Sequence, residues 1–238
     1  MEEDRSLDVD ITPVIGGVFS CITNYCHDYH GVMNTGHSTT LTDLLCVSGA
    51  LCGRAAREFS LETFPNSGGT EKSLVRVLWG EAGKEFTQCG SDTLLAWFRE
   101  APQVGISGKH APGYKEIRAI DKMEKQTNLT FPLGYDKRFG QVIPLNLAAS
   151  DLWANVFGLA QSVTTEGAHF VALWAGVYNS LHMLRQEPCF LYKKPNANKK
   201  IAQKMLFRSV WGGAKTKPLS RREIENVYKL ALCEGPCQ

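Results

Sequence analysis

Several patterns that would assign the chain to a functional class are missing from it. The first ten residues hold five acids and one base, the opposite of the basic start of a secretory signal. The net charge of +2 gives no overall attraction to nucleic acid or to membranes. There is no internal repeat and no low-complexity tract. We therefore expect an ordinary globular protein located in the cytoplasm.

Long apolar segments are also scarce. The longest uncharged run, residues 167–184, is interrupted by two histidines, an asparagine and a serine. We read this run as a buried helix, the most apolar and the expected centre of the domain, and we expect no membrane partner. Without export, the eight cysteines are expected to be reduced thiols.

Signatures of catalysis are absent too. The sequence has no H-E-x-x-H zinc motif, no paired C-x-x-C and no G-x-S-x-G nucleophile elbow. The glycine-rich stretch NSGGTEKS, residues 66–73, lacks the residue order of a phosphate-binding loop and is expected to be a connector. Whether the chain is an enzyme therefore stays open.

Apolar spacing predicts a mostly helical chain. Residues 13–30 repeat apolar side chains every three or four positions, with Gly31 as the expected terminator. Thr40 and Asp43 predict the start of a second helix, whose many glycines and alanines favour close packing against a neighbour. Further helices are predicted at residues 91–98 and 114–126 and in the last third of the chain, the final one from a capping box that starts at Ser220.

One segment predicts strands instead. Residues 73–79, SLVRVLW, are apolar and contain two valines, and the turn GEAG leads on to KEFTQ. We therefore predict one short β-hairpin near residues 73–88 and, with about seven helices, an α+β fold that is predominantly α-helical. Residues 1–190 are expected to form a helical core domain that contains the hairpin. Residues 191–238 are expected to form a basic two-helix segment packed on that core.

Residues 21–37, CITNYCHDYHGVMNTGH, hold two of the eight cysteines and three of the six histidines. Cys26 and His30 are four positions apart, and His27 and His30 are three apart. Either pair can chelate a metal from one helix, with His37 folding back as a third ligand. This pattern indicates a zinc site and metal-assisted hydrolysis. The alternative is structural, because histidines in the last turn of a helix complement its dipole and exposed carbonyls.

Two weaker signals complete the catalytic candidates. Glu166 and His169 form one E-x-x-H pair, whereas di-iron bundles need two such pairs. Cys89 precedes an expected helix start, where the pKa of a thiol can fall far enough to make a nucleophile. The simpler interpretations are a core histidine and a structural thiol.

The C-terminal segment is basic. From Lys193 to Lys229 the chain holds eleven of its 26 basic residues and only two acids. A predicted helix places three of them, four positions apart, along one stripe. Clustered positive side chains suit phosphate contacts, so the segment predicts binding of nucleic acid or another polyanion, against the alternative of a solvated helix face. The candidate contacts are Lys199, Lys200, Lys204, Arg208, Arg221 and Arg222.

The leading interpretation is a binding or protein-interaction module without a catalytic motif. A protein partner or self-association is then expected. The first alternative is a metal-assisted hydrolase that uses Cys26, His27, His30 and His37 with zinc as its cofactor. The second alternative is nucleic-acid or polyanion binding through the basic C-terminal helices.

Overall fold

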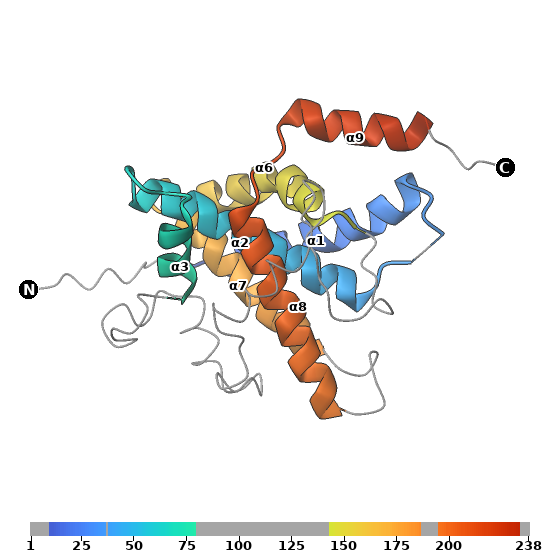
Figure 1. Ribbon diagram of the computed structural model, residues 1–238, viewed down its shortest axis with the longest axis horizontal. Coiled ribbons are helices and arrows are strands. Elements are labelled where there is room, and N and C mark those ends of the chain that lie inside the picture. Colours follow the sequence, from blue (N-terminus) through green and yellow to red (C-terminus); the bar gives the residue numbers. More distant parts are fainter. Residues whose placement is uncertain (1–9, 37, 80–142, 187–194, 234–238) are drawn as a thin grey trace, which may run out of the picture.

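The computed structural model describes residues 10–36, 38–79, 143–186 and 195–233. Figure 1 shows a bundle of long helices, and the described residues contain seven helices and no β-strand. No helix in these ranges is both long enough and apolar enough to cross a lipid bilayer. In chain order the helices are α1 (Thr12–Val32), α2 (Leu41–Thr63), α3 (Glu71–Trp79), α6 (Leu145–Val163), α7 (Ala168–Gln186), α8 (Pro195–Lys215) and α9 (Arg221–Cys233).

The predicted β-hairpin near residues 73–88 is wrong, and so is the α+β fold class that depended on it. The predicted first strand is part of the helix α3, and the described part of the chain is predominantly α-helical. The predicted second strand, residues 84–88, lies outside the described residues. The helices predicted at residues 91–98 and 114–126 lie outside them as well.

Side-chain spacing explains why the α3 segment is helical. Leu74, Val77 and Leu78 are buried against the bundle, at the three- and four-residue spacing of one helix face. Thr70 begins the helix, because its hydroxyl accepts a hydrogen bond from the amide of Ser73 at 3.3 Å. The same apolar residues fit a strand or a helix by composition, and burial of one helical face decides between them.

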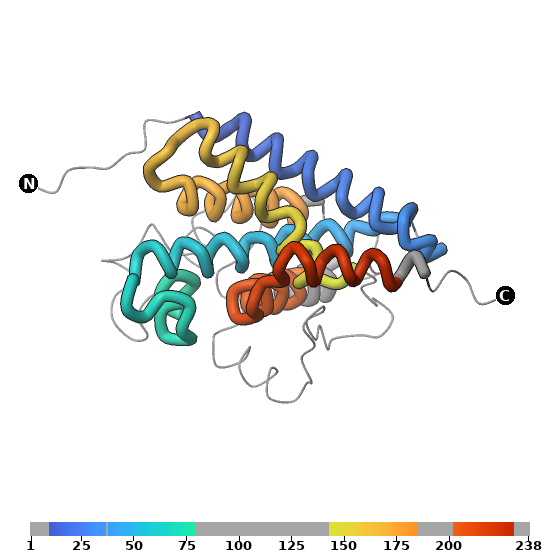
Figure 2. Tube along the Cα trace, turned by 90° about the horizontal axis from the view of Figure 1, so that it is seen from above, coloured from blue at the N-terminus to red at the C-terminus, as the bar shows by residue number. Residues whose placement is uncertain are grey.

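α2 is the most enclosed helix of the bundle. Figure 2 shows it running between α8 on one side and α6 and α7 on the other, and its most extensive contacts are with α8 and α7. The helix that was expected at the centre, α7, instead exposes Tyr178 and His182. The long uncharged run favoured α7, but the small residues of α2 allow neighbours to approach it from several sides.

Glycine lets α2 and α8 cross at close range. A Cβ atom at Gly53 would overlap the carbonyl oxygen of Val210, and one at Gly213 would overlap the carbonyl oxygen of Ala50. The low helix propensity of these glycines is therefore offset by backbone-to-backbone packing. This confirms the close approach predicted from the composition of the second helix.

In the connection between α1 and α2, the end of α1 differs from the prediction, whereas the start of α2 matches it. α1 runs through Gly31, and the chain turns only at Asn34 and Gly36, which have positive φ angles of 44° and 69°. Thr40 caps α2 as predicted, since its hydroxyl accepts a hydrogen bond from the amide of Asp43 at 3.1 Å.

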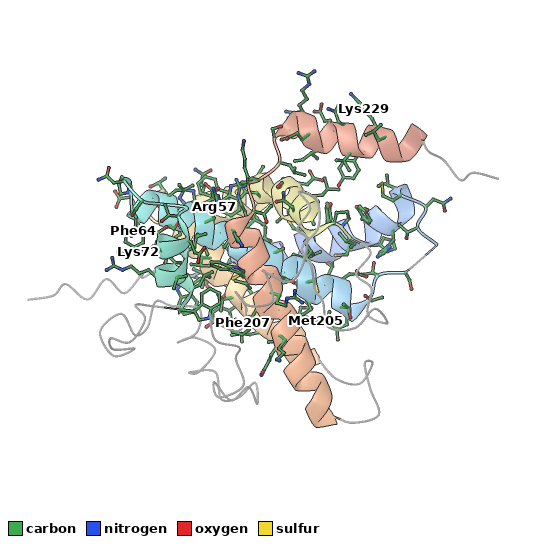
Figure 3. The ribbon with its side chains drawn as sticks, viewed as in Figure 1. Arg57, Phe64, Lys72, Met205, Phe207 and Lys229 are labelled. Carbon is green, nitrogen blue, oxygen red and sulfur yellow. The ribbon has the colours of Figure 1, made fainter. Side chains whose placement is uncertain are left out.

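α8 is packed within the bundle, whereas α9 lies along its outer side, over α6 (Figure 1). Arg57 of α2 fixes the end of α8, because its Nη1 donates to the carbonyl of Ala214 at 3.1 Å (Figure 3). The capping box predicted for the last helix is present. The amide of Ser220 donates to Glu223 Oε2 at 2.7 Å, and the Ser220 hydroxyl accepts from the Glu223 amide at 3.4 Å.

Candidate functional site

His30, the central residue of the predicted metal site, belongs to a buried hydrogen-bond network that joins α1 to α2. Its Nε2 lies 3.3 Å from Oδ2 of Asp43, and its Nδ1 lies 2.8 Å from the hydroxyl oxygen of Thr35. The same Asp43 oxygen accepts hydrogen bonds from the amide and the hydroxyl of Thr40, at 3.0 and 2.7 Å. Asp43 is only 2% exposed, so these donors replace water around its carboxylate.

The network occupies both ring nitrogens of His30. A carboxylate accepts hydrogen bonds, so Nε2–H donates to Asp43, and Nδ1 forms a second hydrogen bond with the hydroxyl of Thr35. A metal ion needs a free lone pair on one of these nitrogens. Both ring nitrogens therefore already have partners, and these hydrogen bonds stabilise the connection between α1 and α2.

The other predicted ligands do not assemble around His30 in the described part of the chain. His27 is exposed, whereas His30 is buried. Cys26 is buried, and burial raises the pKa of its thiol, which disfavours the thiolate that a metal requires. Within the described ranges, no three His, Cys, Asp or Glu side chains form a group that could hold a metal ion. His37 lies outside these ranges, so its predicted role stays a prediction.

The basic residues of α8 do not form an open stripe where the structure describes them. Arg208 is 4% exposed and Lys204 is half-buried. Lys199 and Lys200 lie in the first turns of α8, but their side chains are outside the described part. Because α8 packs against α2 and further helices, the four-residue spacing does not face solvent along its whole length.

The two remaining candidate polyanion contacts are on α9. Arg221 and Arg222 are both exposed. Arg221 Nε donates to Glu225 Oε1 at 3.1 Å, one helical turn away. Such pairs stabilise a helix by about 0.2–0.5 kcal/mol, so this contact is sufficient to explain the position of Arg221.

The structure describes two of the three remaining catalytic candidates, Glu166 and His169. Cys89 is outside the described residues. Glu166 is exposed before α7, and the carboxylate that contacts His169 is that of Glu62 on α2, with 2.9 Å between His169 Nδ1 and Glu62 Oε2.

The contact between Glu62 and His169 belongs to a cluster of side chains that joins α2, α6 and α7, which we call the Arg54 cluster. Its members are Arg54, Glu58, Glu62, Trp153, Phe157 and His169.

Arg54 lies in the middle of α2 and is incompletely paired. Its Nη2 is 2.9 Å from Glu58 Oε1, and its guanidinium carbon is 5.4 Å from the centre of the Trp153 ring. Its Nε and Nη1 atoms are buried and have no hydrogen-bond partner among the described residues. Burial lowers the pKa of the guanidinium, an effect that Glu58 opposes and Arg57 reinforces.

Three rings stack beside this guanidinium. The ring centres of Phe157 and His169 are 4.5 Å apart with 23° between their planes. Trp153 lies 6.1 Å from His169 and 5.6 Å from Phe157, with interplanar angles of 6° and 20°. These are offset-stacked arrangements of half-buried rings. The cluster therefore places flat apolar surface next to hydrogen-bond donors that have no acceptor among the described residues.

The Arg54 cluster was not predicted from the sequence, although part of its signal was present. Arg54, Glu58 and Glu62 are four positions apart, which places them along one side of a helix, and Trp153 and Phe157 have the same spacing on the next long helix. The spacing does not show that the two sides meet. The contact between Glu62 and His169 joins residues 107 positions apart.

Comparisons of the chain with protein-family models, with curated proteins and with solved structures find no match.

Proposed function

We propose that this chain is a binding module and that the Arg54 cluster receives the carboxylate of a small ligand. One observation supports the proposal above all: Nε and Nη1 of Arg54 are buried without an acceptor among the described residues. A buried donor without a partner costs about 1–3 kcal/mol, and more when the group is charged. A ligand whose carboxylate accepts from Nε removes the part of that cost that belongs to Nε, so its binding free energy also stabilises the fold.

The shape of the guanidinium favours a carboxylate over a single oxygen atom. Glu58 meets only Nη2 of Arg54, at 2.9 Å. Nε and Nη2 lie along one edge of the guanidinium, so a carboxylate on that edge accepts from both nitrogens at once. The carboxylate of the ligand then competes with that of Glu58, which is partly exposed and is able to turn toward water.

The neighbouring rings favour a ligand with a flat apolar body. Trp153, Phe157 and His169 are all half-buried and nearly parallel to one another. Stacked or edge contacts with such rings contribute about 0.5–1.5 kcal/mol beyond area burial. An aromatic carboxylate such as benzoate meets both requirements. Acetate lacks the ring, and benzamide lacks the charge.

Isothermal titration calorimetry with benzoate, acetate and benzamide tests the proposal. The unmodified chain should bind benzoate more tightly than either of the other two. Arg54→Met should abolish benzoate binding. Glu58→Gln should strengthen it by about twofold or more, because it removes a competing ion pair worth about 0.3–0.5 kcal/mol.

Arg221→Met is the matched control. It removes a positive charge from an arginine that also pairs with a glutamate one turn away, but on the exposed face of α9. Benzoate binding should be unchanged in this variant. Equal losses in both arginine variants would indicate attraction to net charge and reject the site. No benzoate binding by the unmodified chain would reject it as well.

A further inference from the structure

α9 is the least enclosed of the described helices. It lies along the outside of the bundle, over α6 (Figure 1). Ile224, Val227 and Tyr228 are half-buried against the bundle. On the rest of its surface, Lys229 points away from the bundle and Leu230 is 62% exposed (Figure 3). Among the described residues, only a small apolar area therefore holds α9 in place.

A chain of hydroxyl groups supplies the polar part of this contact. The Tyr228 hydroxyl donates to Oδ2 of Asp151 on α6 at 2.8 Å, and it lies 3.0 Å from the hydroxyl of Tyr25 on α1. Because Tyr228 gives its one proton to Asp151, Tyr25 is the donor in the second bond. Burial raises the pKa of both tyrosines, so both keep their protons. We call this chain the tyrosine latch.

The segment before α9 is fixed to α6. Asn146 Nδ2 donates to the carbonyl of Lys217 at 3.0 Å, and the amide of Leu219 donates to the hydroxyl of Ser150 at 3.0 Å. Pro218 lies between these two bonds and restricts its own φ angle. Any movement of α9 is therefore expected to start after Leu219.

α9 has local contacts that do not depend on the bundle. The capping box of Ser220 and Glu223 satisfies amides at its start, and Arg221 pairs with Glu225 on its exposed side. These contacts favour the helical state when the apolar side is uncovered. We therefore expect α9 to stay helical when it detaches from the bundle.

We propose that α9 is a latched arm. It swings from α1 and α6 as one helix about Leu219, the tyrosine latch holds it closed, and the remaining bundle stays folded when it opens. Opening uncovers the sides of α1 and α6 that carry Tyr25 and Asp151. The arm does not depend on the proposed ligand site, because none of the latch residues belongs to the Arg54 cluster.

Hydrogen–deuterium exchange of the full chain, resolved by peptide, tests this proposal. Tyr228→Phe keeps the ring and removes both hydroxyl contacts. Amides of α9 should then exchange about tenfold faster or more, because one lost bond is to a carboxylate and the other joins two half-buried hydroxyls. Amides of α2 should exchange at an unchanged rate.

Two further variants test whether faster exchange in α9 depends on the hydroxyl groups of the tyrosine latch. Tyr25→Phe removes one bond of the latch and should accelerate exchange in α9 by a smaller factor, about threefold to tenfold. Tyr178→Phe removes the hydroxyl of an exposed tyrosine on α7 and should leave both helices unchanged. Equal acceleration in α9 and α2, or unchanged exchange in α9 of Tyr228→Phe, overturns the proposal. Failure of Tyr228→Phe to fold also overturns it, because the bundle must be stable without the latch.

Discussion

Two histidines meet carboxylates of α2, at opposite ends of that helix. At its start, His30 contacts Asp43 inside a buried network, and each of the atoms that binds Asp43 Oδ2 is a hydrogen-bond donor. Near its end, His169 contacts Glu62 in a half-exposed position. Beside this second pair, Arg54 keeps two buried nitrogens without a described partner.

The hydrogen-bond network of Asp43 and the Arg54 cluster differ in how completely described residues satisfy the polar groups that they contain. A complete buried network strengthens the fold and leaves no group for a ligand. An incomplete network lowers stability until something supplies the missing acceptor. The contacts of His30 and Asp43 therefore support a structural role for these two residues, and the incomplete cluster at Arg54 is the better candidate for recognition.

The largest expected effect comes from displacing α2 itself, since both ends depend on its position. Gly53→Val directs a side chain against the carbonyl of Val210. We expect a loss of more than about 3 kcal/mol in the free energy of unfolding, or failure to fold, measured by denaturant titration. Gly158→Ala is the control, because a Cβ there meets nothing within 4 Å, and it should add about 0.5–1 kcal/mol. A loss below about 1 kcal/mol for Gly53→Val would contradict the close helix crossing.

The next largest loss of stability is expected at the start of α2, where Asp43 lies. Asp43→Ala removes one half of the capping box of α2, leaves the buried Nε2–H of His30 without its acceptor, and removes the acceptor of the Thr40 amide and hydroxyl. We expect a loss of about 2–4 kcal/mol, measured by denaturant unfolding. Asp43→Asn keeps one acceptor oxygen and should lose less. Equal losses in the two variants would show that the hydrogen bonds of Asp43 do not carry the effect.

Between the two ends, α2 carries buried thiols that make stability depend on pH. Burial raises the pKa of Cys46 and of Cys52 to about 12, from an ordinary value of 9.0. Above pH 9 the unfolded chain loses these protons while the folded chain keeps them, so stability falls as the pH rises toward 12. Each thiol should lower the free energy of unfolding by about 1.4 kcal/mol at about pH 10.

Denaturant unfolding at about pH 8 and about pH 10 measures this effect, with Cys52→Ala as the comparison. The variant should lose less stability over the interval than the unmodified chain, by about the contribution of one thiol. An identical decrease in both would mean that Cys52 is not shielded from solvent in the folded state.

The smallest effect on stability is expected at Arg54. Arg54→Met removes a guanidinium with two buried nitrogens that have no partner in the described part of the chain, and it keeps an unbranched apolar chain of similar length. The free energy of unfolding should change by less than about 1 kcal/mol in either direction, because the lost ion pair is offset by the removed desolvation cost. A loss as large as that of Asp43→Ala would assign Arg54 to the architecture and weaken the proposed ligand site.

Features that depend on neighbouring residues were predictable from the sequence. Thr40 and Ser220 are helix caps because the residues three positions later complete their hydrogen bonds. The glycines of α2 indicated close packing, because a central glycine in a helix needs a compensating contact.

Features that depend on distant residues were not predictable in the same way. The valines of the α3 segment suggested a strand, and only the bundle that buries Leu74, Val77 and Leu78 makes the segment helical. Arg208 was placed on a solvated face, but the packing of α8 buries it. The Arg54 cluster needs α2, α6 and α7 to meet, which no local spacing encodes.

The most direct test of the ligand site observes Arg54 itself. In nitrogen-15 spectra of arginine side chains, titration with benzoate should shift the Nε–H resonance of Arg54, assigned by its loss in Arg54→Met, to a saturable end point. The Nε–H resonance of Arg221 should shift little, because that group is exposed and already paired with Glu225. An Arg54 resonance that stays fixed, or that moves linearly in parallel with Arg221, would contradict the account.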